Sequence, residues 1–452
     1  MSPTSTTGRK HVVTEWTPED PAKWDQSLAW KTLWTTTYSL MLGFVVWFLV
    51  SSLTPMLTNA SVVTQSQAYW LAAMPGLAGG ALRLLWMFLP PIMGTRNMVI
   101  WSTVALMAPM VGWAWLLTVV QPLNAAGEQP LYAGMMLLAF LTGIGGGVFS
   151  GYMPSTSFFF PKAKQGVALG LQAGLGNFGV SVVQLVTPIV VGMGLFGGTL
   201  AVHNKKTGAV RDVYLQTAPS LVLPLLIISL VVAIAVLKSV PIKANFKQQL
   251  DIFGNKHTWL MTLEYVLTFG IFSGLAGQFG NVLTALYGSQ PTISWLGGAG
   301  IAFLGAFVGS LARVAWGPFC DRFGGGIWTF VAGIGIAIGC IPVLVALRDD
   351  VAGQTNMVSM PVFLTGMFLI FFFAGVGNAS TFKQMPMIFP PRQAGGVIGW
   401  TAAIAAFGPF LFGVAFDSFS RTAVFGFVLV YALLCAGIAW YYYARKNAEA
   451  KG

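Results

Sequence analysis

About a dozen long apolar stretches, separated by short polar segments, dominate this chain of 452 residues. Each is long enough, at ~20 residues, for an α-helix to cross the hydrocarbon core of a bilayer. Charged residues make up only 8% of the chain, against about 25% in soluble domains. Most of the chain therefore cannot face water, and the sequence predicts an all-α integral membrane protein.

The apolar stretches predict twelve transmembrane helices. Their predicted bounds are 33–55, 66–90, 98–121, 131–160, 165–195, 217–237, 258–282, 294–317, 326–347, 357–388, 395–416 and 422–443. The predicted domains are an N-terminal tail (1–32), a six-helix half (33–237), a linker (238–257), a second six-helix half (258–443) and a C-terminal tail (444–452).

Lysine and arginine are distributed unequally between the two sides of the predicted membrane. With the N-terminus inside, 16 of the 24 fall in inside segments, 5 in outside segments and 3 within spans. This bias fits the positive-inside rule, so we expect both termini to be cytoplasmic. The net charge of +11 includes no contiguous basic run, and we expect no nucleic-acid partner.

The two predicted halves are related in sequence. A shift of 229 lays residues 160–179 on 389–408 without gaps, and 7 of the 20 positions agree, where this composition gives about two by chance. A shift of 230 lays Arg83 on Arg313 and Gly94 on Gly324. Two parallel six-helix repeats resemble the organisation of major facilitator transporters, whose substrate site lies between the halves near the midplane.

Arg83 and Arg313 lie inside predicted spans 2 and 8. An arginine there costs about 3 kcal/mol on insertion scales unless it faces protein, water or an anion. Snorkelling or pairing with a carboxylate is the alternative, but only Glu264 lies well inside a span, and it cannot neutralise both arginines and Lys383. Guanidinium donates two parallel hydrogen bonds to an oxyanion. We therefore predict that the two arginines hold a small planar oxyanion between the halves.

Predicted span 5 is rich in glycine. Small residues at every fourth position let a neighbouring helix approach closely, and the glycines concerned are Gly166, Gly170 and Gly174, with Gly176 and Gly179 on a second face. Helix packing alone explains these glycines equally well. It does not explain Asn177, an amide deep in the span that is able to donate to an oxyanion.

Three aromatic residues complete the candidate site. Tyr265 and Phe269 are four residues apart in span 7 and so share a face, and Phe149 follows the glycine run in span 4. Flat rings suit a flat anion. Ordinary packing is the alternative, because phenylalanine is common in membrane spans.

The chain resembles the nitrate/nitrite porters of the major facilitator superfamily over nearly its whole length. The segments that carry the resemblance are EWTPEDPAKW (15–24), LAAMPGLAGGALR ending at Arg83, SFFFPKAKQGVALGLQAGLGNFGVSVVQ (157–184), TFGIFSG (268–274), SLARVAWGPFCDRFGG (310–325) and GGVIGWTAAIAAFG (395–408).

This resemblance implies a site. Arg83 and Arg313 match the residues that clamp the anion in that family, and further matching residues shape the pocket: Phe149, Tyr265, Phe269 and Asn177. Gly174 and Gly176 fall in the span 5 stretch that resembles the family's nitrate signature, and we include them among the substrate-binding candidates. Asp321 and Arg322 lie in a segment that resembles the superfamily's cytoplasmic loop motif, and they are candidates for closing the inside gate.

Two features depart from the family's exchangers. Glu264 in span 7 and Lys383 in span 10 are charged, and both spans line the central cavity in this fold. The two residues form either a structural ion pair or a proton-linked switch. In addition, the link between spans 10 and 11 is short (PPRQ, 390–393), whereas some exchangers carry a long charged insertion there.

We therefore expect a nitrate/nitrite transporter that works by alternating access, importing nitrate and exporting nitrite in exchange. Proton-coupled uptake through Glu264 is the alternative, and an anion channel or a membrane sensor is the remote one. No enzyme is expected, because His11, His203 and His257 all lie outside the spans and no nucleotide loop is present. We expect no cofactor and no metal, a monomer in contact with membrane lipid, and a location in a bacterial inner membrane.

Overall fold

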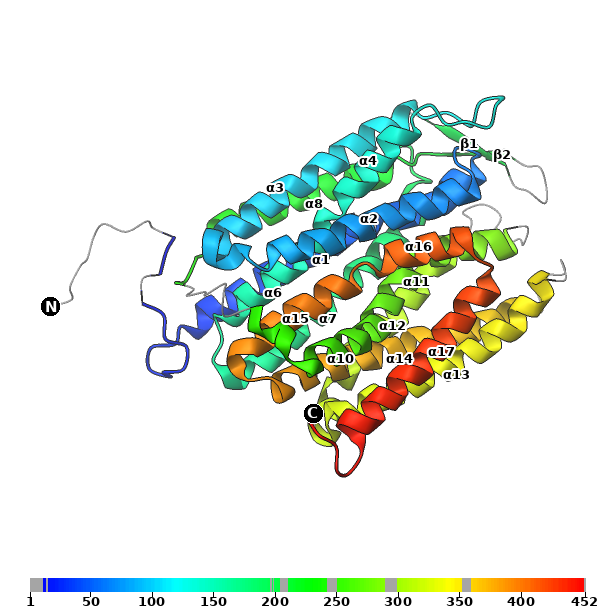
Figure 1. Ribbon diagram of the computed structural model, residues 1–452. Coiled ribbons are helices and arrows are strands. Elements are labelled where there is room, and N and C mark those ends of the chain that lie inside the picture. The colour runs from blue at the N-terminus through cyan, green and yellow to red at the C-terminus, as the bar shows by residue number, and fades with distance from the viewer. Residues whose placement is uncertain are drawn as a thin grey trace.

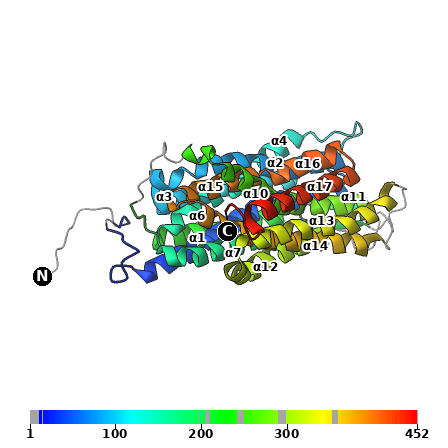
Figure 2. The same cartoon turned by 60° about the horizontal axis from the view of Figure 1, so that its bottom comes forward.

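Long helices that run roughly along one direction account for most of the described chain (Figure 1). The computed structural model describes residues 11–13, 15–195, 197, 199–203, 210–241, 250–288, 299–351 and 359–450. Part of the predicted outside loop between spans 7 and 8, the first residues of predicted spans 8 and 10, and part of the predicted linker lie outside these residues. Figure 2 shows the helices extending from the end that holds the N-terminus to the opposite end.

The N-terminal half contains eight helical segments and one β-hairpin. They are α1 (Gln26–Asn59), α2 (Gln65–Trp86), α3 (Leu89–Val119), α4 (Tyr132–Thr142), α5 (Ile144–Gly147), α6 (Phe149–Ser157), α7 (Lys162–Val190), β1 (Leu200–His203), β2 (Val210–Val213) and α8 (Thr217–Val236). The two strands pair antiparallel, with Leu200 opposite Val213. This hairpin, which our sequence analysis did not predict, marks one end of the bundle in Figure 1; we call it the hairpin end, and the opposite one the terminal end.

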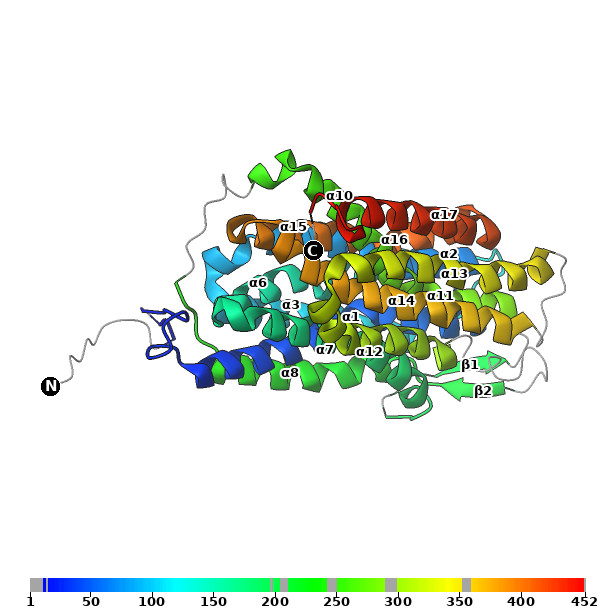
Figure 3. The ribbon, with the colours of Figure 1, turned by 90° about the horizontal axis from the view of Figure 1, so that it is seen from below.

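The C-terminal half begins with a short 3₁₀ helix. Its segments are η1 (Leu250–Gly254), α10 (Lys256–Tyr265), η2 (Val266–Gly270), α11 (Ile271–Tyr287), α12 (Ala299–Phe323), α13 (Gly325–Val351), α14 (Ser359–Ile388), α15 (Pro391–Ala405), α16 (Gly408–Ser418), α17 (Arg421–Ala439) and η3 (Trp440–Ala444). Seen from below, α12, α13 and α14 lie in front of α1 and α2, so the halves form two layers (Figure 3).

Among the described residues, eleven helices are long and apolar enough to cross a membrane. The one predicted span not among these eleven is 66–90, which corresponds to α2. The 22 residues of this helix reach about 33 Å at 1.5 Å per residue. Several bounds differ from the predictions: α3 begins at Leu89 rather than at 98, and α12 ends at Phe323 rather than at 317. Helix α1 begins at Gln26 rather than at 33, because the side chain of Asp25 caps it by accepting a hydrogen bond from the backbone of Leu28 at 2.9 Å. The predicted span 131–160 is divided into α4, α5 and α6, in a stretch that glycine weakens as a helix.

The predicted repeat reappears in the backbone. Gly94 and Gly324, which the shift of 230 superimposes, have φ values of 71° and 90°. Glycine adopts this conformation without the steric cost that a Cβ imposes. At Gly94 the backbone kinks near the start of α3, and Gly324 separates α12 from α13. The two halves therefore make the same turn at the same place.

Large apolar side chains cover the outside of the bundle. Trp101, Trp115, Phe427 and Val430 are each more than 60% exposed, and Trp113 is fully buried in the same helix as the first two. Soluble proteins rarely show so much contiguous apolar surface. The described surface is that of a bundle surrounded by lipid.

The halves are packed closely at the hairpin end. Trp70 of α2 donates a hydrogen bond to Asp417 of α16 at 2.9 Å, and Gln278 of α11 donates to the carbonyl of Tyr69 at 3.1 Å. A Cβ added at Gly76 would lie only 2.6 Å from the backbone nitrogen of Phe410. This end of the interface between the halves is therefore sealed by α2, α11 and α16.

At the terminal end, three glycine positions have open space beside them. Gly166 at the start of α7 and Gly395 at the start of α15 are a repeat pair, and a Cβ added at either would meet nothing within 4 Å. The same holds for Gly170, one turn further along α7. The contacts that seal the hairpin end thus have no counterpart at these three positions.

The N-terminal tail is anchored to the corner between α6 and α7. Trp16 and Trp24 donate indole hydrogen bonds to the carbonyls of Phe158 and Phe159 at 2.8 and 2.9 Å. Glu19 accepts a hydrogen bond from the backbone of Lys162 at 3.0 Å, at the N-terminus of α7, where a negative charge is favourable. The segment EWTPEDPAKW is therefore a structural part of the N-terminal half.

Some glycines are required by close helix approach. Gly145 of α5 packs against the backbone of α1, so that an added Cβ would overlap the carbonyl oxygen of Gly43. Backbone cannot move aside as a flexible side chain does, and overpacking of this kind costs about 1–3 kcal/mol.

We expect Gly145→Ala to lower the thermal stability of the detergent-solubilised protein, by about 1–3 kcal/mol in unfolding free energy. Gly170→Ala is the matched control, because its Cβ meets open space, and alanine is favoured over glycine in a helix by ~0.5–1 kcal/mol. Equal melting temperatures for the two variants would contradict this account of α1–α5 packing.

Candidate functional site

Arg83 lies in the last turn of α2 and is completely buried. Its Nε donates to the carbonyl of Gly146 at 2.8 Å, and its Nη1 donates to the carbonyl of Ala402 at 2.8 Å. Its Nη2 is buried and has no hydrogen-bond partner within the described part of the chain. Gly146 belongs to the N-terminal half and Ala402, in α15, to the C-terminal half. Arg83 therefore links the two halves and keeps one donor group free.

Arg313 occupies the corresponding place in α12 and is 5% exposed. Its Nη1 is likewise buried without a hydrogen-bond partner. Arg83 and Arg313 are near enough to interact electrostatically with each other and with Tyr265. The structure thus brings the two predicted arginines together, with unused donors on both.

Aromatic rings connect the two guanidinium groups. The Cζ of Arg83 lies 4.6 Å from the ring centroid of Phe149 and 5.0 Å from that of Phe269. The Cζ of Arg313 lies 4.9 Å from the ring of Phe382, which is itself 5.1 Å from the ring of Tyr265. Cation–π contacts of this kind stabilise a desolvated guanidinium by about 2 kcal/mol. The rings replace part of the hydration that burial removes from the arginines.

Tyr265 and Phe269 stack face to face, 5.5 Å apart and within 5° of parallel. The segment between them is not ordinary α-helix: η2, from Val266 to Gly270, is a π-helical turn between α10 and α11. Such turns are rare and frequent at functional sites. The prediction that the two rings share a face is met, and the local geometry that holds them there was not predicted.

Asn177 is 1% exposed in α7, and neither atom of its amide has a hydrogen-bond partner. One turn earlier, Gly174 packs on α12 beside Arg313, where an added Cβ would lie 2.5 Å from the Cγ2 of Val314. Gly176 instead packs against Leu40 of α1. Gly174 therefore borders the arginine site, whereas the contact at Gly176 is with the neighbouring helix of its own half.

The suggested pairing of Glu264 with Lys383 is wrong for this structure. Lys383 forms an ion pair with Asp321 at 2.5 Å, which joins α14 to α12 within the C-terminal half. Glu264 is fully buried, and both of its carboxylate oxygens lack a hydrogen-bond partner. Its helix turns it toward α17, where it interacts electrostatically with Tyr431 and Cys435.

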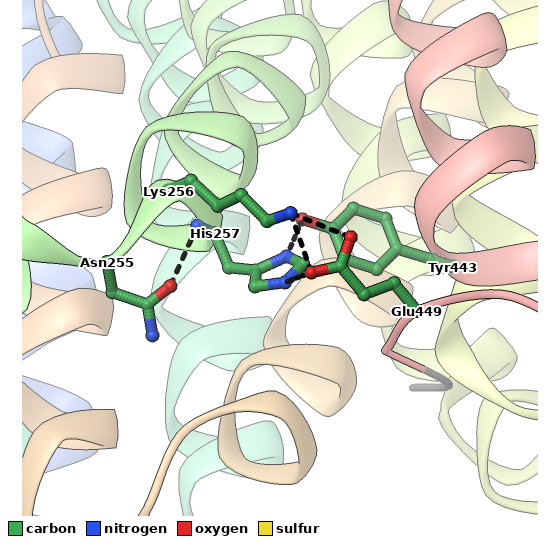
Figure 4. Close-up of polar contacts among 5 residues, drawn as sticks. All are labelled: Asn255, Lys256, His257, Tyr443 and Glu449. Carbon is green, nitrogen blue, oxygen red and sulfur yellow. Dashed lines mark hydrogen bonds and ion pairs between the residues drawn. The ribbon is translucent and has the colours of Figure 1, made fainter.

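A polar cluster at the start of α10 ties the C-terminal tail to this region (Figure 4). Lys256 and Glu449 form a salt bridge with an N–O distance of 2.6 Å, and His257 Nδ1 lies 3.1 Å from the hydroxyl of Tyr443. The hydrogen bond from Lys256 lowers the pKa of the Glu449 carboxyl. Tyr443 also interacts electrostatically with Glu264. Glu264 thus interacts with α17 and η3, the elements that lead into the C-terminal tail.

The two gating candidates, Asp321 and Arg322, make different contacts. Asp321 is engaged by Lys383, as described above, and this ion pair does not cross between the halves. Arg322 is exposed, and its guanidinium lies over the ring of Phe323 at 5.2 Å. Neither contact bridges the two halves in this conformation.

Sequence reasoning missed three contributors to the site. Phe382 packs on Arg313, Trp47 lies 5.1 Å from the Cζ of Arg83, and Ala402 provides the carbonyl that holds Nη1 of Arg83. Phe382 directly precedes Lys383, and a charged residue in a span is a stronger sequence signal than a phenylalanine. The carbonyl of Ala402 carries no side-chain signal, although its segment belongs to the predicted repeat.

This arrangement fits non-covalent anion binding. Two permanent cations from different halves are held in a water-poor aromatic enclosure, and each keeps a free N–H group. Charge-assisted hydrogen bonds to an oxyanion are roughly twice as strong as neutral ones.

Comparison with known proteins agrees with this architecture. Residues 35–407 match the family model described as Major Facilitator Superfamily. A D-xylose-proton symporter has a similar structure, with a TM-score of 0.64, 16% identity and coverage of 91% of this chain and 97% of that one. An inward-open xylose transporter, XylE from E. coli, gives a TM-score of 0.61 at 15% identity. At such identities the likeness shows the fold alone, and it confirms the predicted twelve-helix major facilitator fold.

Relatives in sequence are more specific. The chain is 50% identical over 451 residues to the probable nitrate/nitrite antiporter NarK2 of Thermus thermophilus, with 97% of both proteins covered. It is 31% identical over 473 aligned positions to the nitrate/nitrite transporter NarU of Escherichia coli, with 98% of both covered. The chain therefore belongs to the major facilitator superfamily and, within it, to the nitrate/nitrite porters.

Proposed function

We propose that this protein transports nitrate and nitrite by alternating access, importing nitrate and exporting nitrite in exchange. The observation that carries the proposal is the pair of buried arginines, one from each half, whose free Nη groups have no other partner in the structure. The printed names of the two full-length relatives support the choice of anion and the exchange.

Nitrate and nitrite suit this site chemically. Both are small, planar and singly charged, so their oxygens accept hydrogen bonds in the plane while their faces pack against rings such as Phe149 and Phe269. The two guanidinium charges repel each other when the site is empty of anion, and a bound anion offsets that repulsion. Binding thereby favours a closer approach of the two halves around the anion.

The direction of opening follows from the charge distribution and the contacts. The lysine and arginine bias supports a cytoplasmic location for the terminal end. The hairpin end is sealed by contacts such as that between Trp70 and Asp417, so this conformation faces inward. Exchange then requires the contacts at the hairpin end to break and new ones to form at the terminal end, near Asp321 and Arg322.

Proton-coupled uptake is a second candidate, favoured by one observation. A fully buried carboxyl without a hydrogen-bond partner, as at Glu264, is costly in its charged form and is stabilised by taking up a proton. Its position beside α17 means that any coupling to the anion acts through helix movement rather than through direct contact with the arginines.

Nitrate uptake into proteoliposomes distinguishes the two candidates. With exchange, internal nitrite drives uptake of external nitrate, and an acid-outside pH gradient without internal nitrite does not. With symport, the pH gradient alone drives uptake, and Glu264→Gln abolishes that drive. Failure of nitrate to move under either condition would contradict the proposed substrate.

We expect Arg83→Lys and Arg313→Lys each to reduce nitrate uptake at least about tenfold, although the charge is kept. A lysine ammonium is a flexible point charge, and it cannot hold the fixed donor directions of a guanidinium; loss of one charge-assisted hydrogen bond costs about 1.5–3 kcal/mol. At Arg83 the lysine must also replace the bonds to Gly146 and Ala402.

Arg211→Lys is the matched control for these variants, because Arg211 is exposed in β2 at the hairpin end, and it should transport normally. Wild-type uptake rates from both arginine variants would contradict the proposal that Arg83 and Arg313 bind the anion.

A further inference from the structure

Asn378 of α14 is a buried amide that the site described so far does not use. It is 1% exposed, and neither its Oδ1 nor its Nδ2 has a hydrogen-bond partner among the residues that the structure describes. Leaving a buried polar group without a hydrogen-bond partner lowers the stability of the folded protein. Such a group usually has a function, a bound molecule or a switching partner that accounts for it.

The packing of α14 on α12 places Asn378 at the level of Arg313. Gly375 packs directly on the backbone of Gly309, so that an added Cβ would overlap the carbonyl oxygen of Gly309. The two helices run in the same direction, since the ion pair between Lys383 and Asp321 lies further along both. Arg313 is four residues beyond Gly309, and Asn378 is three residues beyond Gly375.

The same face of α14 carries the ring that packs on Arg313. Phe382 is four residues after Asn378 and therefore lies on its side of the helix. The Cζ of Arg313 is 4.9 Å from the centroid of that ring. Asn378 is thus one helical turn from a residue in direct contact with the guanidinium, between Gly375 and Phe382.

The internal repeat supports this placement independently. The shift of 229, which lays residues 160–179 on 389–408, also lays Asn378 on Phe149. Phe149 lies against Arg83, 4.6 Å from its Cζ. Pseudo-symmetry therefore puts an aromatic ring beside the arginine of the first half and an amide beside the arginine of the second.

We propose that Asn378 is a further ligand of the transported anion, donating its amide N–H groups to an oxygen that the arginines leave free. This inference rests on the function proposed above. Two nitrogens of Arg83 already donate to the carbonyls of Gly146 and Ala402. Arg83 and Arg313 alone therefore leave some oxygens of the anion without a hydrogen-bond donor. Nitrate has three oxygens and nitrite two; Asn378 therefore contributes more to nitrate binding than to nitrite binding.

The test uses Asn378→Leu, which replaces the amide with an apolar side chain of similar size. Nitrate and nitrite affinities are measured by calorimetry on the purified full-length protein, and uptake is measured in proteoliposomes. We expect nitrate affinity to fall at least tenfold and nitrite affinity to fall about threefold or less. The melting temperature should not fall, because the change removes an unsatisfied buried polar group.

Ser380→Ala is the matched control on the same helix. Ser380 is buried, but its hydroxyl lies 2.8 Å from that of Thr329 on α13, away from Phe382. We expect this variant to lose stability while the ratio of nitrate to nitrite affinity stays at the wild-type value. A second variant, Asn378→Asp, should lose affinity for both anions at neutral pH, because its carboxylate repels them.

Each result has a definite meaning. Unchanged affinities for both anions in Asn378→Leu and Asn378→Asp overturn the role of Asn378 while leaving the proposed transport function intact. A lower melting temperature with unchanged affinities overturns it too, because that is the behaviour of a structural residue. Absence of nitrate and nitrite binding in the wild-type protein overturns the proposed function and this inference together.

Discussion

Two guanidinium charges are buried in the middle of a bundle whose interior is mostly apolar. In so weak a dielectric, an unpaired charge is very costly, and both arginines are surrounded accordingly. Arg83 donates to two backbone carbonyls, and aromatic rings cover both cations. The remaining donors, Nη2 of Arg83 and Nη1 of Arg313, have no partner from the described chain. The interior is thus arranged around positive charge that an anion completes.

The fold positions this charge through close helix contacts. Glycines let backbones touch where α5 meets α1 and where α14 meets α12, and small residues at such contacts are the usual means of packing helices in lipid. Because Arg83 and Arg313 come from different halves, any movement of one half against the other changes their separation. The hydrogen bond from Arg83 to Ala402 shows that the clamp itself already spans the interface.

The other charged residues within the predicted spans, Lys383 and Glu264, interact with groups other than Arg83 and Arg313. Lys383 is neutralised by Asp321 within one half, and Glu264 lies toward α17, near the cluster that ties the C-terminal tail to α10. Within the described residues, no carboxylate occupies the free donors of Arg83 and Arg313 that we propose bind the anion. This arrangement suits exchange of one anion for another, in which the charge of the site is restored by the next anion.

The amino-acid sequence by itself determined the membrane class, the two related halves and the pair Arg83 and Arg313, because hydropathy, repeats and charge within a span are local properties of the chain. The aromatic residues Phe149, Tyr265 and Phe269 could also be predicted, from spacing and from a family resemblance. Only the tertiary structure decided that Lys383 binds Asp321, that Glu264 turns away, and that Phe382 and the carbonyl of Ala402 belong to the site. A span that is apolar all round carries no signal for which face meets which neighbour, so partners across helices are fixed by packing alone.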